Sequence, residues 1–455
     1  MLIDKLINIL RVTLFYIKSI MNTEKVRPKI VVLGGGFAGL QFIQNLKEDE
    51  FDIMLIDKLN HHQFQPLFYQ VATSQIEPSS ISFPFRKIFQ KRKDVRIRLT
   101  KAESIDPENK QVITPIGKFD YDFLVIATGC KTNYFGNKNI KKFAYGLKST
   151  YQAITIRNSI LENFEKILYV DEKEKEALMN IVVVGGGPTG VELAGAFAEI
   201  KKEVLPKDFF RIDFSKMNII LLEGSPNTLN NMSNMSRNAS TDYLKELGVI
   251  IKTGVMVSDY DGTNLKMNNG ETIKSRHVIW AAGVTGNLIK GMDQNVVTNT
   301  NRFKVDRYNR ITGYENIFAI GDISYMETAL YPKGHPQVAN VAINQGKLLA
   351  QNMVNLNSKN PLKPYEYKDL GVMATIGRHK AVVELPFVKF KGYFAWFIWM
   401  FLHLMLILSV RNKLIIFINW AWNYFSKNSS LRLILKDDDR PDFTKDKQKV
   451  VPEIY

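Results

Sequence analysis

A chain of 455 residues is long enough for two or three domains that each bury a hydrophobic core. Its composition, 45% hydrophobic and 23% charged, is that of an ordinary globular protein. The formal charge of +16 favours an anionic partner, which is a nucleic acid, a membrane surface or an anionic cofactor. Because the sequence contains no zinc finger and no ribonucleoprotein aromatic motif, we expect no nucleic-acid partner and assign the charge to a membrane and to dinucleotides.

The first twenty residues, MLIDKLINILRVTLFYIKSI, are apolar but are interrupted by Lys5, Arg11 and Lys18. No run reaches spanning length and no A-x-A cleavage site follows, so we expect no secretory signal. Two interpretations of residues 1–24 stay open. They form an amphipathic helix at a membrane surface, or synthesis starts at Met21 and the residues before it are not native.

The same sequence unit occurs twice, 151 residues apart. Lys29–Gln41 reads KIVVLGGGFAGLQ and Asn180–Glu192 reads NIVVVGGGPTGVE. Each copy has a short β-branched run, three glycines, two further residues, another glycine and then an apolar helical pattern. This period is too long for a solenoid repeat, so it predicts two copies of one domain type, each with a buried parallel strand before its glycines.

Both copies have the G-x-G-x-x-G spacing between a predicted strand and a predicted helix. The first glycine permits a tight turn, the second lets a pyrophosphate approach the backbone, and the third packs the helix on the strand. The phosphates of a dinucleotide would then lie at the helix N-terminus, where free N–H groups and the helix dipole favour anions. The glycines at these positions are Gly34, Gly36 and Gly39 in the first copy, and Gly185, Gly187 and Gly190 in the second.

An acidic residue ends a later predicted strand in each copy. The run FDIMLID ends at Asp57, eighteen residues past Gly39, and MNIILLE ends at Glu223, thirty-three residues past Gly190. We expect residues 199–214 to form a helix extension and a loop, which accounts for the longer second gap. A single acid at a strand end is usually only solvated, but two acids in matching places favour ribose binding.

Three further apolar strands, in residues 121–129, 277–283 and 316–324, end in small residues, and the last carries Gly321 and Asp322. With the two glycine loops, these strands resemble the two-dinucleotide-binding-domain flavoproteins. That resemblance implies an α/β fold of two Rossmann-like domains, with FAD on the first and NADH on the second, which is inserted into the first. It also implies that Asp322 bonds the ribityl chain of the flavin.

The single cysteine, Cys130, narrows the choice within that family. One thiol forms neither an internal disulfide nor a CxxC pair, so the mechanisms of disulfide reductases, thioredoxin reductases and sulfide–quinone reductases are excluded. We expect Cys130 to be an inert buried thiol. His61 and His62 are not accompanied by further ligands at metal-binding spacing, so we predict loop histidines and no metal site.

Several independent motifs resemble the type II NADH dehydrogenases, which are single-subunit, non-proton-pumping NADH:quinone oxidoreductases. The resemblance covers roughly residues 25–425 and extends into the aromatic C-terminal segment. The matching motifs are residues 58–78, Asn133-YFG, Gly187-PTGVELAG, Trp280-AAGV, Phe318-AIGD and the run GVMATIGRHKAVVEL at residues 371–385.

This resemblance implies a respiratory-chain enzyme of electron transport that passes hydride from NADH to FAD and then two electrons to a membrane quinone. Two other functions stay open: a soluble NADH oxidase or ferredoxin-type reductase, and a regulatory flavoprotein that binds NADH. The implied domains are an FAD-binding domain (25–148 and 299–370), an NADH-binding domain (149–298), a C-terminal helical membrane-anchoring region (371–435) and a charged tail (436–455).

The resemblance also implies which residues contact each cofactor. Those for FAD are Gly34, Gly36, Phe37, Ala38, Gly39, Asp57, Ala127, Thr128, Gly129, Asp322 and Ala339. Those for NADH are Gly185, Gly187, Pro188, Thr189, Gly190, Glu192, Glu223, Ala282 and Gly283.

A predicted helix near Pro336 has asparagines where the family commonly has the glutamines of an A-Q-x-A-x-Q motif. Asn340 and Asn344 keep the amide but lose one methylene of reach, so quinone contact is expected with altered hydrogen-bond geometry. Gln337 and Gln345 could compensate, and Gln345 joins the quinone candidates. Pro336 is predicted in the first turn, with the helix dipole directed at the pyrimidine end of the flavin.

Glu192, Asn340 and Asn344 are the candidate catalytic residues that the resemblance implies. Glu192 lies in the second glycine loop, and the resemblance places it near the flavin, where it adjusts quinone reduction or relays protons. The alternative is that Glu192 is a first-turn acid that only complements the helix dipole.

The aromatic C-terminal segment predicts membrane binding. Tyr393–Val410 contains no Asp, Glu, Lys or Arg and would span about 27 Å as a helix, against a hydrocarbon core of about 30 Å. Clustered Trp and Tyr and flanking basic residues favour monotopic binding. For a member of the family that the sequence resembles, we expect this binding at the cytoplasmic face of the inner (cytoplasmic) membrane. A spanning helix and a buried core helix remain as alternatives. The partners implied are NADH, a membrane quinone and the membrane surface, and a homodimer is compatible with them.

Overall fold

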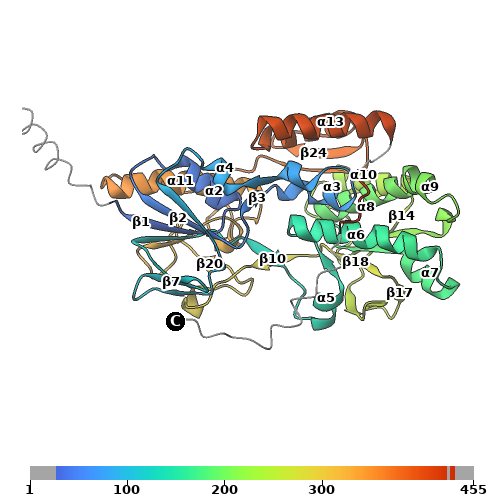
Figure 1. The fold of residues 1–455 in the computed structure, drawn as a ribbon, viewed down its shortest axis with the longest axis horizontal. Helices are drawn as coiled ribbons and strands as arrows, with labels where there is room; N and C mark the ends of the chain where they lie inside the picture. Colours follow the sequence, from blue (N-terminus) through green and yellow to red (C-terminus); the bar gives the residue numbers. More distant parts are fainter. Residues whose placement is uncertain (1–26, 428–430, 436–455) are drawn as a thin grey trace, which may run out of the picture. The chain divides into compact units, whose positions relative to one another are not determined.

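The computed structural model describes residues 27–427 and 431–435, which divide into two compact units (Figure 1). The first unit holds residues 27–60, 85–129 and 286–367, and the second holds residues 61–84, 130–285 and the described residues from 368 onward. The predictions for residues 1–24 and 436–455 lie outside the described residues.

The first unit is built on a five-stranded parallel sheet. Alternate residues of its central strand, β1 (Lys29–Leu33), face opposite sides of the sheet. Ile30 and Val32 therefore belong to one core cluster, and Val31 and Leu33 belong to another. Helices α2 (Phe37–Asn45) and α11 (Ala339–Asn357) pack against each other in the first of these clusters. The strand order is β21 (Ile317–Ala319), β9 (Phe123–Ile126), β1 (Lys29–Leu33), β2 (Asp52–Asp57) and β5 (Val95–Leu99).

A second five-stranded parallel sheet forms the centre of the other unit and repeats this order. Its strands are β11 (Tyr145–Gly146), β18 (His277–Trp280), β12 (Asn180–Val184), β13 (Asn218–Glu223) and β14 (Val249–Thr253). In both units the glycine-loop strand lies between the strand that ends in the acid and the strand that ends in small residues. The prediction of two Rossmann-like units is therefore confirmed.

Helix α8 (Pro188–Glu203) follows the second glycine loop and is followed by the short helix α9 (Leu205–Asp208) and a loop, as expected for residues 199–214. Further helices are α4 (Phe85–Ile88), α5 (Lys138–Phe143), α6 (Thr150–Ile167), α7 (Glu172–Met179) and α10 (Asn234–Glu246). Small antiparallel sheets are formed by β6 (Ser104–Asp106), β7 (Gln111–Thr114) and β8 (Gly117–Asp120), and by β15 (Val257–Tyr260), β16 (Asn264–Met267) and β17 (Thr272–Lys274).

Residues 61–84 group with the second unit, although they lie within the range 25–148 that the sequence assigns to the FAD-binding domain. They contain β3 (His61–Gln63), α3 (Phe68–Ala72) and β4 (Ser82–Pro84), and α3 packs on α6 and α8. The prediction of loop histidines is wrong, because both histidines lie on β3 and His62 is buried. Cys130 begins strand β10 (Cys130–Thr132) and is only partly buried, which corrects the expectation of a buried thiol.

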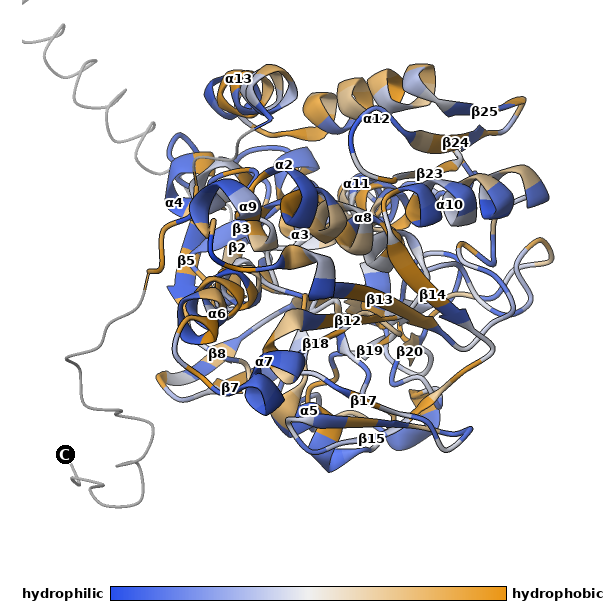
Figure 2. Cartoon of the chain, turned by 90° about the vertical axis from the view of Figure 1, so that its right-hand side faces the viewer, coloured by the Kyte–Doolittle hydropathy of each residue, from blue (hydrophilic) through white to orange (hydrophobic). Residues whose placement is uncertain are grey.

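The chain ends its described part with a sheet and two helices. Strands β23 (Val372–Thr375), β24 (Ala381–Leu385) and β25 (Val388–Gly392) are antiparallel, and they lead into α12 (Tyr393–Leu406) and α13 (Val410–Ser426). Strand β23 packs on α8, and α12 packs on β24 and β25. Figure 2 shows α12 as mostly hydrophobic.

The apolar run Tyr393–Val410 is not one helix. Helix α12 ends at Leu406, Ile407 is extended, and α13 begins at Val410. Fourteen helical residues span about 21 Å, which is less than the hydrocarbon core. Among the described residues, no helix has both the length and the apolar character needed to cross a membrane.

Candidate active site

The first and third glycines of both loops are required by the fold. Gly34 and Gly185 have φ angles of +101° and +113°, in the region that favours glycine. A Cβ on Gly39 would lie 2.0 Å from the Gly34 carbonyl oxygen, and a Cβ on Gly190 would lie 1.8 Å from that of Gly185. These approaches let each helix pack directly on its strand.

The middle glycines differ, because space is open beside them. A Cβ on Gly36 or Gly187 would meet no heavy atom within 4 Å. Each of these glycines is the N-cap of the following helix, α2 or α8, and neither helix has a side-chain hydrogen bond at its cap. The open space and the helix N-terminus together fit a phosphate group that approaches the backbone.

Each strand-end acid lies against its own glycine loop. Asp57 accepts hydrogen bonds from the backbone N–H of Gly35 (2.7 Å) and of Leu59 (2.8 Å). Glu223 likewise accepts from Gly186 and Ser225. The two loops thus have matching carboxylates at the carboxyl end of the second strand, which is where a dinucleotide's ribose is bound in this kind of fold.

Two glutamines hold the turn that carries Asp322. Gln345 is fully buried, and its Oε1 accepts from the Gly321 N–H (2.7 Å) and the Ser324 hydroxyl (3.0 Å). Gln337 donates to the Asp322 carbonyl (3.0 Å). The turn that presents Asp322 is therefore fixed from two directions.

Helix α11 begins later than the sequence predicts. Its first residue is Ala339 and its N-cap is Val338, so the prediction that Pro336 lies in the first turn is wrong. Within the helix, Asn344 Nδ2 donates to Asn340 Oδ1 at 2.7 Å, as their spacing of four residues allows. The structure thus brings the two asparagines together.

The other predicted contacts lie at the same edges of the two sheets. Thr128 follows β9, and its hydroxyl donates to the Asn287 carbonyl at 2.8 Å. Phe37 and Ala38 begin α2, and Pro188 and Thr189 begin α8. The remaining residues, Ala127 and Gly129 after β9 and Ala282 and Gly283 after β18, are at corresponding positions of the two units.

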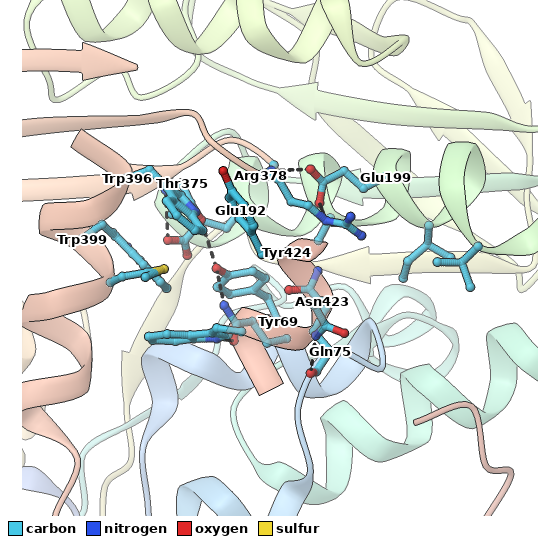
Figure 3. Close-up of a pocket in the computed structure, with 17 residues that line it drawn as sticks. Tyr69, Gln75, Glu192, Glu199, Thr375, Arg378, Trp396, Trp399, Asn423 and Tyr424 are labelled. Carbon is cyan, nitrogen blue, oxygen red and sulfur yellow. Dashed lines mark hydrogen bonds and ion pairs between the residues drawn. The ribbon is translucent and has the colours of Figure 1, made fainter. Parts of the chain in front are cut away.

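A cavity of about 60 Å³ lies within the second unit, and no motif predicted it. Its walls come from α3, α8, the turn after β23, α12 and α13 (Figure 3). The residues that line it with polar or aromatic groups include Tyr69, Glu192, Glu199, Trp399, Trp420 and Tyr424.

Glu192 is buried in the wall of this cavity. Its Oε1 accepts a hydrogen bond from the Thr375 N–H at 3.4 Å. Burial raises the pKa of Glu192 to about 8, although the Thr375 N–H and the Trp399 indole oppose that rise. The carboxyl therefore holds a proton at neutral pH. Glu192 is the fifth residue of α8, so the alternative of a first-turn acid is not supported.

A chain of hydrogen bonds crosses the cavity wall. The Tyr69 hydroxyl is 3.0 Å from Thr375 Oγ1 and accepts from Gln70 Nε2, while Gln70 Oε1 accepts from the Trp420 indole N–H at 2.8 Å. Burial raises the pKa of Tyr69 well above its ordinary value, which keeps the phenol neutral. Sequence reasoning missed these residues, because they meet only when α3, β23 and α13 pack together.

Comparison with known proteins identifies the family of this chain. The family model described as pyridine nucleotide-disulphide oxidoreductase matches residues 28–346, and the NDH2 C-terminal domain matches residues 370–427. The type II NADH:quinone oxidoreductase Ndh of Mycobacterium tuberculosis is 35% identical over 420 residues, which cover 88% of this chain and 89% of the relative. This chain belongs to the type II NADH:quinone oxidoreductase family.

Other members are more distant in sequence. The mitochondrial internal alternative NAD(P)H-ubiquinone oxidoreductase A1 of Arabidopsis thaliana is 28% identical, with 88% of this chain and 85% of the relative covered. The structure of NDH2 from Plasmodium falciparum in complex with NADH has the same fold, with a TM-score of 0.83, 22% identity, and coverage of 90% of this chain and all of that chain. The family's C-terminal domain corresponds to β23 through α13, the elements that close the cavity over α8.

No group of three or more His, Cys, Asp or Glu side chains suited to a metal ion occurs in the described part of the chain. The candidate site features are, in the first unit, the glycine loop with Asp57 and the turn at Asp322, and, in the second unit, the glycine loop with Glu223 and the cavity beside Glu192.

Proposed function

We propose that this chain is an NADH:quinone oxidoreductase of respiratory electron transport, which takes hydride from NADH, uses FAD and reduces a membrane quinone without pumping protons. The observation that carries the proposal is the presence of two glycine loops of matching build in a chain with one cysteine. Such a chain can hold two dinucleotides but has no dithiol to reduce. Family membership supports the same activity.

The first unit would hold FAD and the second NADH. The backbone of the loop at Gly36 would take the pyrophosphate of FAD, with Asp57 toward the ribose and Asp322 toward the ribityl chain. When bound, FAD supplies a ring system that accepts hydride and passes on two electrons. The loop at Gly187 would hold NADH in the same manner, with Glu223 toward its ribose.

We propose that Glu192 of the second unit and Asn340 and Asn344 of the first take part in quinone reduction. Glu192 is buried and protonated at neutral pH, so it can donate a proton to a reduced quinone oxygen. Since Gln345 is buried and engaged with Gly321, its contribution would be to position the Asp322 turn.

Steady-state turnover separates this proposal from a soluble oxidase, a ferredoxin-type reductase and a regulatory flavoprotein. Washed membranes from an overexpressing strain should oxidise NADH with ubiquinone or menaquinone analogues as acceptors. Slow turnover with both analogues, together with fast turnover on oxygen or a ferredoxin, would refute the quinone assignment.

Glu223 should set the choice of nicotinamide cofactor. Its carboxylate can accept from the 2′-hydroxyl of NADH and repels the 2′-phosphate of NADPH. We expect kcat/KM for NADH to exceed that for NADPH at least about tenfold, or roughly 1.4 kcal/mol. Glu223→Gln should narrow this ratio, and Glu271→Gln, an exposed acid of the same unit, should leave it unchanged. Equal use of both cofactors by the wild type would disprove this role.

The exposed apolar side chains of α12 and α13 should bind the membrane surface at the cytoplasmic face. Phe401, Phe417 and Trp422 are 60%, 51% and 62% exposed. Basic residues nearby would add about 1 kcal/mol each at an anionic surface. Deleting everything from Tyr393 onward would also remove Trp399, which is only 1% exposed and belongs to the cavity wall, so point substitutions are the better test.

The triple variant Phe401→Ser, Phe417→Ser, Trp422→Ser should release the flavin-loaded protein from anionic vesicles in a flotation assay. Its turnover with a long-chain quinone should fall at least about tenfold, while turnover with ferricyanide stays near wild type. The matched control is Phe210→Ser, since Phe210 is 80% exposed but lies outside these helices. A triple variant that still floats with vesicles would show that the anchor lies elsewhere.

A further inference from the structure

A second carboxyl, that of Glu199, lies on the same face of α8 as Glu192. Glu192, Gly195 and Glu199 are spaced three and four residues apart, so they line one side of the helix. Gly195 brings the β23–β24 turn against this side, because a Cβ there would lie 2.9 Å from the Gly377 nitrogen. The turn backbone therefore lies directly over the helix between the two carboxyls.

The same short segment of backbone holds both carboxyls. The Thr375 N–H donates to Glu192 Oε1, and the Arg378 N–H donates to Glu199 Oε1 (Figure 3). The φ angle of Gly377 is +70°, which favours glycine, and a Cβ there would lie 2.8 Å from Glu199 Oε1, so a larger residue would displace that carboxyl. Glu199 is thus held in a defined position.

The space between the carboxyls suits water. Seven residues of helix separate the two Cα atoms by about 10 Å, and each carboxyl accepts a hydrogen bond from a different backbone N–H. Both side chains line the cavity of about 60 Å³, and one water needs roughly 10–15 Å³ of such space, so several waters fit. Tyr69, Asn423 and Tyr424 supply further polar atoms to the lining. The side chain of Glu199 keeps 11% of its surface exposed.

We propose that Glu199 takes a proton from solvent and passes it through waters in this cavity to Glu192, which gives it to the quinone. The inference rests on the proposed function. The overall reaction, NADH + H⁺ + quinone → NAD⁺ + quinol, takes one proton from solvent. Glu199 loses that proton to a water chain, Glu192 gains it, and solvent then reprotonates Glu199. Glu199 does not touch the quinone and acts only through Glu192, so we call it a positioning residue and not a catalytic residue.

The charges around Glu199 are consistent with this transfer. Burial raises the pKa of Glu199 to about 7, against the effect of Arg378, and Glu203 on the next turn adds to the rise. Burial also raises the pKa of Glu192, to about 8, so both carboxyls can bind and release a proton near neutral pH. The other titratable groups at the cavity are Tyr69 and Tyr424 from α3 and α13; the His379 ring, on the turn, lies 4.7 Å from that of Tyr424.

The test compares Glu199→Gln with wild type in full-length, flavin-loaded protein. We expect kcat with quinone to fall about tenfold at pH 8 and less at pH 6, because protons in solution become scarce as pH rises. Single-turnover reduction of the flavin by NADH should be unchanged. Glu199→Asp keeps a carboxyl and should restore most of the lost rate. The matched control is Glu271→Gln, an exposed acid of the same unit that does not line the cavity, which should retain the wild-type pH profile.

Each outcome decides the inference. A Glu199→Gln protein with wild-type kcat at every pH would overturn it, and so would an equal loss at all pH values that Glu199→Asp does not relieve. If Glu199→Gln fails to retain flavin, the pH profile of Glu199→Asp is compared instead; a profile unchanged from wild type would then overturn the inference, and one shifted by the altered carboxyl would support it. Wild-type protein that does not reduce quinone in the same assay would refute the proposed function itself.

Discussion

Replacing Gly187 with alanine should strongly weaken NADH binding while the protein stays folded and keeps FAD. A Cβ at this position meets no heavy atom within 4 Å, and the φ angle of −72° suits alanine. The added methyl would occupy the space through which the pyrophosphate approaches the backbone. We expect the Kd for NADH to rise at least about a hundredfold, or roughly 2.7 kcal/mol, in a titration of the flavin-loaded protein.

Gly190→Ala provides the contrast, because its Cβ would lie 1.8 Å from the Gly185 carbonyl oxygen. This variant should lose thermal stability as well as NADH binding, since α8 can no longer pack on β12. Gly36→Ala, the equivalent of Gly187→Ala in the first unit, should lose FAD instead of NADH. If Gly187→Ala binds NADH normally, the assignment of the second loop to NADH is incorrect.

The features that the sequence predicted correctly are local or repeated. The strand, the glycine loop and the helix of each unit follow one another directly, and every glycine has a steric or open-space role that its spacing indicates. The positions of Asp57 and Glu223 could be predicted from the sequence, because the strand that each acid ends pairs with the glycine-loop strand of its own sheet. Two copies of the pattern made each interpretation stronger than one copy would.

The features that sequence reasoning missed depend on contacts between distant segments. Strand β3 exists only because His61–Gln63 pairs with Ser82–Pro84. The apolar run after Tyr393 contains no glycine, proline or charge to mark its break near Ile407. Glu199 had one local indication, its seven-residue spacing from Glu192, but the Arg378 N–H that holds it is 179 residues away.

The start of helix α11 was predicted wrongly for a different reason. A proline is favoured in the first turn of a helix, and that preference placed the helix start at Pro336. The actual start, at Ala339, leaves Gln337 outside the helix, where its side chain donates to the Asp322 carbonyl. The hydrogen bond to the turn accompanies the later start, and local preference alone gives no sign of it.

Glu192→Gln should reduce quinone turnover more than any other substitution in the cavity. Glutamine keeps the shape and can still accept from the Thr375 N–H, but it cannot donate a proton and regain it. General acid catalysis contributes about 10²- to 10⁴-fold in rate, so we expect kcat with quinone to fall at least about a hundredfold. Reduction of the flavin by NADH in a single turnover should persist, since that step precedes quinone reduction. Gln70→Glu, which adds a carboxyl to the same cavity, should not restore the rate.

The same variant tests the buried state of Glu192 without any turnover. Folding raises the pKa of this carboxyl from 4.5 to about 8, so its protonated form is the stable one in the folded protein. The protonated carboxyl therefore makes its full contribution to the free energy of unfolding below pH 4.5. As pH rises from 4.5 to about 8 this contribution is lost, because the unfolded protein releases the Glu192 proton more readily than the folded protein does. The melting temperature of Glu192→Gln, relative to wild type, should therefore rise between pH 5 and pH 9, by an amount on the order of a few degrees. A constant difference across this range would mean that Glu192 is ionised in the folded protein, and it could then not serve as the proton donor.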